Sequence, residues 1–109
     1  MNERDKELIL ALRKKLPQAL ADHLKELIIF GSRVRGDSTD DSDLDVLALV
    51  DEKTPEIEQG FEDVVYQVMW DHDFRPIISL KVLELSKYRD AVKKGFSFYK
   101  HIEKEGVVA

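Results

Sequence analysis

The sequence contains no cysteine, no long hydrophobic run and no excess of basic residues. Without cysteine the chain forms no disulfide and no thiolate metal site. No apolar run approaches the roughly 18 residues that a membrane span needs, so we expect no membrane partner. The opening residues, Met-Asn-Glu-Arg-Asp-Lys-Glu, are too charged for a secretory signal. A cytoplasmic location fits these absences.

The charge balance argues against one class of ligand. The net charge is −5, from 17 basic and 22 acidic residues, so the chain is a poor candidate for binding nucleic acid by charge alone. Nucleotide binding is not excluded, because a bound cation offsets nearby carboxylates. The histidines are scattered without metal-ligand spacing, and we expect surface or core roles for His23, His72 and His101.

Length and patterning predict one domain, residues 1–109, of the α/β (α+β) class. Hydrophobic periodicity predicts helices over residues 3–16, 55–70, 84–94 and 97–103, with a short continuation after Pro17 through Leu20 and Leu24. Strands are expected at residues 27–30, 44–50 and 74–80, with Val107 and Val108 as a small edge strand. This order of elements implies a small mixed sheet packed by helices.

The most informative stretch contains Gly31-Ser32 and, ten residues later, Asp43-Leu44-Asp45. Gly31 lets the backbone approach a ligand closely or adopt a positive φ. The Ser32 hydroxyl and nearby N–H groups are suitable donors to phosphate oxygens. Arg33 and Arg35 are within reach of the same region and suit the negative charge of a triphosphate. These four residues, Gly31, Ser32, Arg33 and Arg35, are the expected nucleotide-binding set.

Asp43 and Asp45 lie where a polar loop becomes an apolar strand. Alternate side chains of a strand share a face, so the two carboxylates point the same way, about 7 Å apart along the strand. Such a pair is costly to bury without a cation, and Mg²⁺ favours one or two carboxylates together with phosphate oxygens and water. Asp43 and Asp45 are therefore candidate ligands of Mg²⁺ or Mn²⁺. The plainer alternative is an acidic surface loop, since Asp37, Asp40 and Asp41 belong to the same segment.

The spacing of Gly31-Ser32 and Asp43-Leu44-Asp45 resembles the signature of the DNA polymerase β-type nucleotidyltransferase superfamily. The short length, and the tail from Phe98 to Val107, are similar to its minimal nucleotidyltransferase branch, whose members often pair with a HEPN-domain protein as toxin and antitoxin. The resemblance implies the nucleotidyltransferase fold. It also implies that Asp43 and Asp45 are catalytic and hold one or two Mg²⁺ ions, while Ser32 and its backbone hold the β- and γ-phosphates of ATP or another nucleoside triphosphate.

The superfamily normally supplies a third carboxylate from a later strand, and this chain departs from that pattern. The strand expected at residues 74–80 contains no acid. Asp73, just before it, is the nearest candidate for a third metal ligand. Asp71 and Asp73 are equally consistent with a solvated turn after the preceding helix.

Two functions therefore stay open. One is Mg²⁺-dependent transfer of a nucleoside monophosphate, AMP from ATP in the first place, to a hydroxyl acceptor such as a partner protein. The other is a weak or inactive subunit of the same fold that acts as an antitoxin through contact with a HEPN partner. An antibiotic-modifying enzyme is less favoured, because 109 residues leave little room for an aminoglycoside-binding domain. The acceptor, the preferred nucleotide and the oligomeric state stay open.

Overall fold

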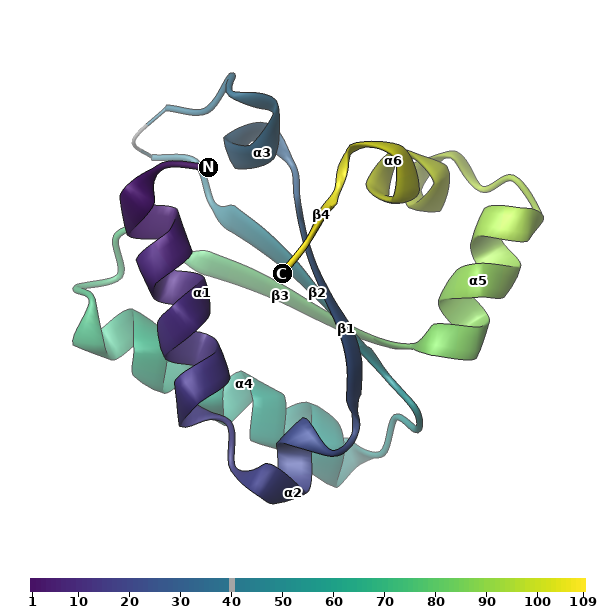
Figure 1. The fold of residues 1–109 in the computed structure, drawn as a ribbon, viewed down its shortest axis with the longest axis horizontal. Coiled ribbons are helices and arrows are strands. Elements are labelled where there is room, and N and C mark those ends of the chain that lie inside the picture. Colours follow the sequence, from purple (N-terminus) through teal and green to yellow (C-terminus); the bar gives the residue numbers. More distant parts are fainter. Residues whose placement is uncertain (40) are drawn as a thin grey trace.

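A mixed β-sheet forms the centre of the computed structural model, which describes residues 1–39 and 41–109 and leaves Asp40 of the acidic loop outside the described residues. The strands lie in the order β3-β2-β1-β4 (Figure 1). Their bounds are β1 (Leu24–Phe30), β2 (Leu44–Val50), β3 (Ile78–Glu84) and β4 (Val107–Val108). β1 is antiparallel to both β2 and β4, whereas β2 and β3 are parallel. The fold is therefore mixed α/β.

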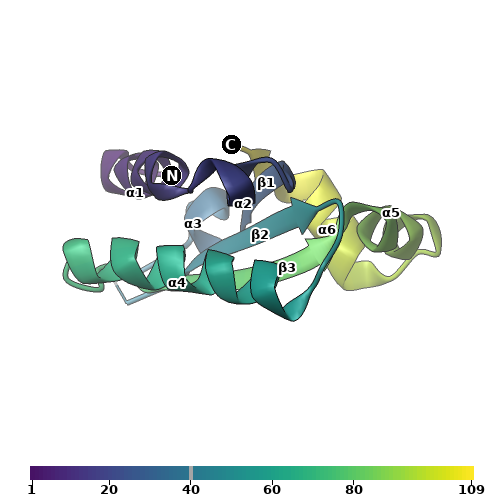
Figure 2. The same ribbon diagram turned by 90° about the horizontal axis from the view of Figure 1, so that it is seen from below.

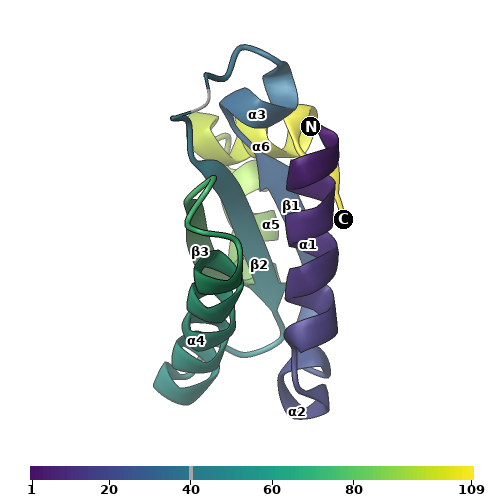
Figure 3. The ribbon, with the colours of Figure 1, turned by 90° about the vertical axis from the view of Figure 1, so that its left-hand side faces the viewer.

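Helices cover both faces of this sheet. They are α1 (Glu3–Lys15), α2 (Gln18–Ala21), α3 (Ser32–Arg35), α4 (Pro55–Asp71), α5 (Leu85–Lys93) and α6 (Ser97–Glu105). α1, α2 and α4 lie on one face, and α5 and α6 lie behind the other (Figures 2 and 3). Within residues 1–39 and 41–109, none of these helices combines the length and the apolar character needed to cross a membrane.

The side chains of β2 alternate between two hydrophobic cores. Alternate residues of the strand join the larger core, which is shared with α1 and α4: Leu44, Val46, Ala48 and Val50. Leu47 and Leu49 instead pack with Tyr88 of α5 and Ile102 of α6. Because alternate side chains share a face, Asp45 lies on the α5 and α6 side of the sheet. The larger core thus packs α1 and α4 against one face of the sheet, and the opposite face carries Asp45.

Most predicted elements are confirmed, and two boundaries were wrong. Leu24 does not continue a helix but begins β1, where it pairs with Val50. The third strand begins at Ile78 rather than at Phe74, because parallel pairing with β2 starts at that residue and the preceding residues form a turn. Asp73 and Phe74 have φ values of 59° and 55°, which are incompatible with an extended strand.

Candidate active site

The end of β1 lies directly against the start of β2, and this places Gly31 beside Asp45. Phe30 and Asp45 are partners in the antiparallel register. Gly31 has φ 86° and ψ −165°, a conformation that is essentially restricted to glycine. A Cβ at Gly31 would overlap Oδ2 of Asp45 and lie 3.1 Å from its Cγ. The absence of a side chain at Gly31 therefore makes the space that the Asp45 carboxylate occupies.

The Asp45 carboxylate is in an environment that disfavours its charged form. Its pKa is raised, first because partial burial removes water from the carboxylate and second because Asp43 is nearby, while the Arg35 charge acts in the opposite direction. Asp43 itself is exposed. A divalent cation would relieve both the burial cost and the repulsion, since Mg²⁺ is commonly held by one or two carboxylates. The two neighbouring carboxylates of Asp43 and Asp45 thus fit one cation.

A cleft of about 570 Å³ opens on this face, between the turn after β1 and helix α6. Four of the predicted site residues belong to its lining: Gly31 just before α3, Ser32 and Arg35 of α3, and Asp45 of β2. The lining from α6 comprises Phe98, His101, Ile102 and Glu105. Asp43 is not a lining residue, although its charge acts on Asp45. The volume lies within the range typical of small-molecule sites.

The two arginines of α3 have different surroundings. Arg35 lines the cleft, with Nε 3.4 Å from Oδ2 of Asp37 and Nη1 3.9 Å from Oε2 of Glu105. Arg33 is buried, with Nη1 3.1 Å from Oδ1 of the buried Asp5, and its Nε donates to the Ser42 carbonyl at 2.8 Å. Arg33 therefore ties α1 to the loop before β2. Of the two arginines expected to bind nucleotide, the structure brings Arg35 to the cleft and gives Arg33 a structural role.

Strand β3 adds Ser79 and Lys81 to the face that carries Asp45. In the parallel register Asp45 pairs with Ser79, and Leu47 pairs with Lys81. Register partners in neighbouring strands present their side chains on the same face, so Ser79 is the side chain beside Asp45. The ammonium of Lys81 lies 5.0 Å from the ring centre of Phe98, which lines the cleft. A hydroxyl and an amine thus stand where a third acid would have completed a cluster of carboxylates.

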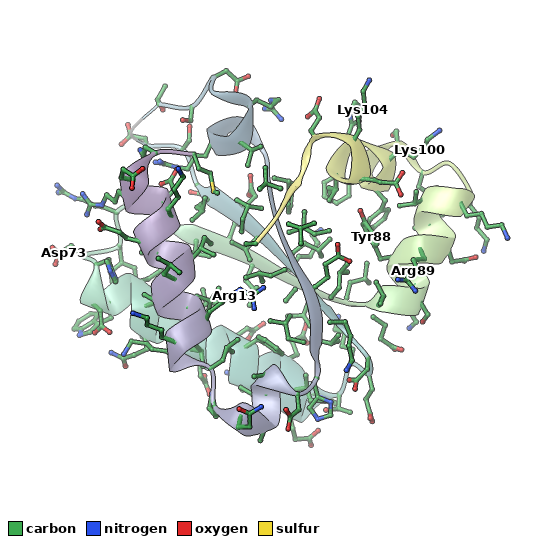
Figure 4. The ribbon with its side chains drawn as sticks, viewed as in Figure 1. Arg13, Asp73, Tyr88, Arg89, Lys100 and Lys104 are labelled. Carbon is green, nitrogen blue, oxygen red and sulfur yellow. The ribbon has the colours of Figure 1, made fainter. Side chains whose placement is uncertain are left out.

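Asp73 lies elsewhere. It is exposed in the connection from α4 to β3, at the edge of the molecule opposite α6, whose Lys100 and Lys104 mark the other side (Figure 4). Over residues 1–39 and 41–109, no three Asp, Glu, His or Cys side chains gather closely enough to hold one ion. The structure therefore does not bring Asp73 together with Asp43 and Asp45.

The contribution of α6 was missed in the sequence. Phe98, His101, Ile102 and Glu105 are spaced i, i+3, i+4 and i+7, which places them on one face of a helix. This helical spacing is evident in the sequence, but the sequence does not show which element the face of α6 contacts. That contact depends on β4, whose Val107 and Val108 pair with Ile29 and Ile28 of β1 and so direct α6 towards the end of β1. His101, which is exposed, consequently lines the cleft from the side of α6.

The chain is similar to known proteins over most of its length. The nucleotidyltransferase domain family matches residues 6–107. The chain is 36% identical over 83 residues to a Methanocaldococcus jannaschii protein named "putative protein adenylyltransferase", a match that covers 73% of this chain and 84% of that protein. A crystal structure named as that of a "putative nucleotidyltransferase" from Sulfolobus solfataricus aligns with a TM-score of 0.46 and 26% identity, covering 99% of this chain and 87% of that one.

Proposed function

Because the chain belongs to the nucleotidyltransferase domain family, we propose that it transfers a nucleoside monophosphate, AMP from ATP in the first place, to a hydroxyl group in a Mg²⁺-dependent reaction. The observation that carries this proposal is the close approach of Gly31 to Asp45, since Gly31, Ser32 and Asp45 all line one cleft. The name of the M. jannaschii relative, a protein adenylyltransferase, favours a protein hydroxyl as the acceptor.

In the proposed reaction the residues of the cleft bind and orient the nucleotide. The Ser32 hydroxyl donates to a phosphate oxygen, and the Arg35 guanidinium offsets part of the triphosphate charge. Asp43 and Asp45 hold the divalent cation. When bound, Mg²⁺ supplies Lewis-acid polarisation of the phosphoryl oxygens and neutralises developing charge. The contribution of the protein is positioning and electrostatic stabilisation.

The chemical step breaks the phosphoanhydride bond between the α- and β-phosphates and forms a phosphate ester bond to the acceptor. The acceptor oxygen forms a bond to the α-phosphorus as the bond from that phosphorus to the pyrophosphate oxygen breaks. The bonding electron pair leaves with pyrophosphate, and the acceptor proton is released to solvent. Helix α6 closes the other side of the cleft, so that Phe98 and His101 limit the direction from which an acceptor approaches.

A contact-only role is the second candidate, and one observation favours it. Ser79, rather than an acid, stands beside Asp45, so the described residues bring two and not three acidic side chains to the cation site. In that case the domain binds nucleotide with little or no turnover and neutralises a HEPN-domain partner by association. This role needs the fold and the partner surface but not the aspartate pair.

The test is label transfer from [α-³²P]ATP with Mg²⁺, using a HEPN-domain partner protein as acceptor. We expect the native protein to label the acceptor and the Asp43→Ala/Asp45→Ala variant to lose labelling while its circular dichroism spectrum is unchanged. Labelling by neither protein, or equal labelling by both, would overturn the proposal. A folded double variant that still binds and inhibits the partner would favour the contact-only role.

A further inference from the structure

The sheet face that holds Asp45 also presents a cation that the proposed reaction has not used. Lys81 and Asp45 lie on neighbouring strands, and the register places their Cα atoms about 8 Å apart by ordinary strand spacing. The Lys81 side chain is exposed, and its ammonium lies over Phe98 at the wall of the cleft. Among the residues that the structure describes, no carboxylate forms an ion pair with this ammonium.

The carboxylates of the site suffice for a single divalent ion. The charge of Asp43 acts on Asp45, and Glu105, the other acid among the described residues that line the cleft, pairs with Arg35. Two-metal sites place their ions about 3.5–4 Å apart, which would require this one pair of aspartates to serve both ions. One divalent ion together with Arg35 leaves part of the triphosphate charge without compensation. An unpaired ammonium on the same face is suited to that remaining charge.

We propose that Lys81 binds a phosphate oxygen of the nucleotide and supplies the positive charge that a second metal ion would otherwise bring, so that the loaded site holds one divalent ion. This inference rests on the proposed function, because it concerns the same nucleotide. Lysine carries a compact charge on a flexible stem, so its ammonium is able to leave the Phe98 ring for a phosphate within reach. The exchange is favourable because a charge-assisted hydrogen bond to phosphate is stronger than a solvent-exposed cation–π contact.

The first experiment counts ions. The full chain is titrated with Mn²⁺ in the presence of α,β-methylene-ATP, a non-hydrolysable analogue, and bound Mn²⁺ is measured by electron paramagnetic resonance. We expect one Mn²⁺ per bound analogue in the native protein and a second in a Ser79→Asp/Lys81→Ala variant, which exchanges the hydroxyl beside Asp45 for a carboxylate. Two ions in the native protein would overturn the inference.

The second experiment measures how much the Lys81 charge contributes to the affinity for the analogue, by calorimetry at fixed Mn²⁺. Lys81→Ala is expected to weaken binding about tenfold, equivalent to about 1.4 kcal/mol. Lys81→Arg should restore most of the affinity, and Lys14→Ala, an exposed position on α1 across the sheet, should leave it unchanged. Equal affinities for Lys81→Ala and Lys14→Ala would overturn the inference and leave the proposed function standing. A native protein that binds no analogue would overturn both.

Discussion

Replacement of Gly31 by alanine separates damage to the site from ordinary backbone strain, because Gly36 provides a matched control. Gly31 and Gly36 have φ values of 86° and 87°, in a region that side chains other than glycine rarely adopt. A Cβ at Gly36 would meet no atom within 4 Å, whereas a Cβ at Gly31 would overlap the Asp45 carboxylate. Both substitutions therefore place a Cβ at a positive φ, and only Gly31→Ala adds a collision inside the site.

The expected stability changes are similar in size. Left-handed strain at Gly36→Ala should cost roughly 1–2 kcal/mol, and the rarer conformation at Gly31 about 1–3 kcal/mol. At about 4 °C for each kcal/mol in a domain of roughly 100 residues, Tm should fall by about 4–8 °C and about 4–12 °C respectively. Stability alone thus does not distinguish the variants, whereas nucleotide affinity should.

Calorimetry of ATP binding with Mg²⁺ is the deciding assay, with thermal unfolding followed by circular dichroism in parallel. We expect Gly36→Ala to retain affinity within about twofold. Gly31→Ala should weaken binding by at least about tenfold, or about 1.4 kcal/mol, because the Asp45 carboxylate must leave the space it occupies. If the two variants bind ATP equally well, the contact between Gly31 and Asp45 does not shape the site.

Two further predictions concern charged side chains. Arg33→Met leaves the Asp5 carboxylate buried without its cation and should cost about 3–5 kcal/mol of stability. Arg35→Met should change Tm little, because exposed ion pairs contribute about 0–1 kcal/mol. The same Arg35→Met variant should nevertheless bind ATP more weakly. Similar Tm losses in both variants would contradict this division. The raised pKa of Asp45 means that the folded state favours the protonated carboxyl, so the metal-free protein loses stability as pH rises through that pKa. Asp45→Asn should therefore raise Tm in EDTA at pH 7. This gain in Tm over the native protein should vanish below the ordinary carboxyl pKa of 3.8. A gain in Tm that is constant with pH would refute the raised pKa of Asp45.

The elements that were predictable from sequence are those with a strong local pattern. β2 has an apolar run bounded by polar segments, and α4 has Thr54 as N-cap, Pro55 in its first turn and a helical period of buried residues. β3 was misplaced because Phe74, Pro76 and Ile77 are as apolar as the strand that follows. Its true start is set by pairing with β2, a long-range contact that local composition does not reveal.

The candidate site was likewise predictable from the sequence only in part. Gly31, Ser32, Arg35 and Asp45 were predicted from the sequence and line one cleft. Arg33 was grouped with Arg35, but residues two apart on a helix of about 3.6 residues per turn point roughly 200° apart, which sends Arg33 towards Asp5. Lys81 and the face of α6 carried no recognisable motif, because their place in the site depends on strand register and on the pairing of β4.

The alternation along β2 has a consequence for changes of chain length. A shift of one residue along a strand moves every following side chain to the other face of the sheet. A one-residue insertion or deletion just after Asp45 would therefore turn Leu47 and Leu49 towards α1. The same change would turn Val46 and Ala48 towards α6. An added residue in the exposed stretch around Asp37 alters neither face. Across relatives we therefore expect the interval between Gly31-Ser32 and Asp43 to vary in length, while the two-residue step from Asp43 to Asp45 and the strand beyond it stay constant.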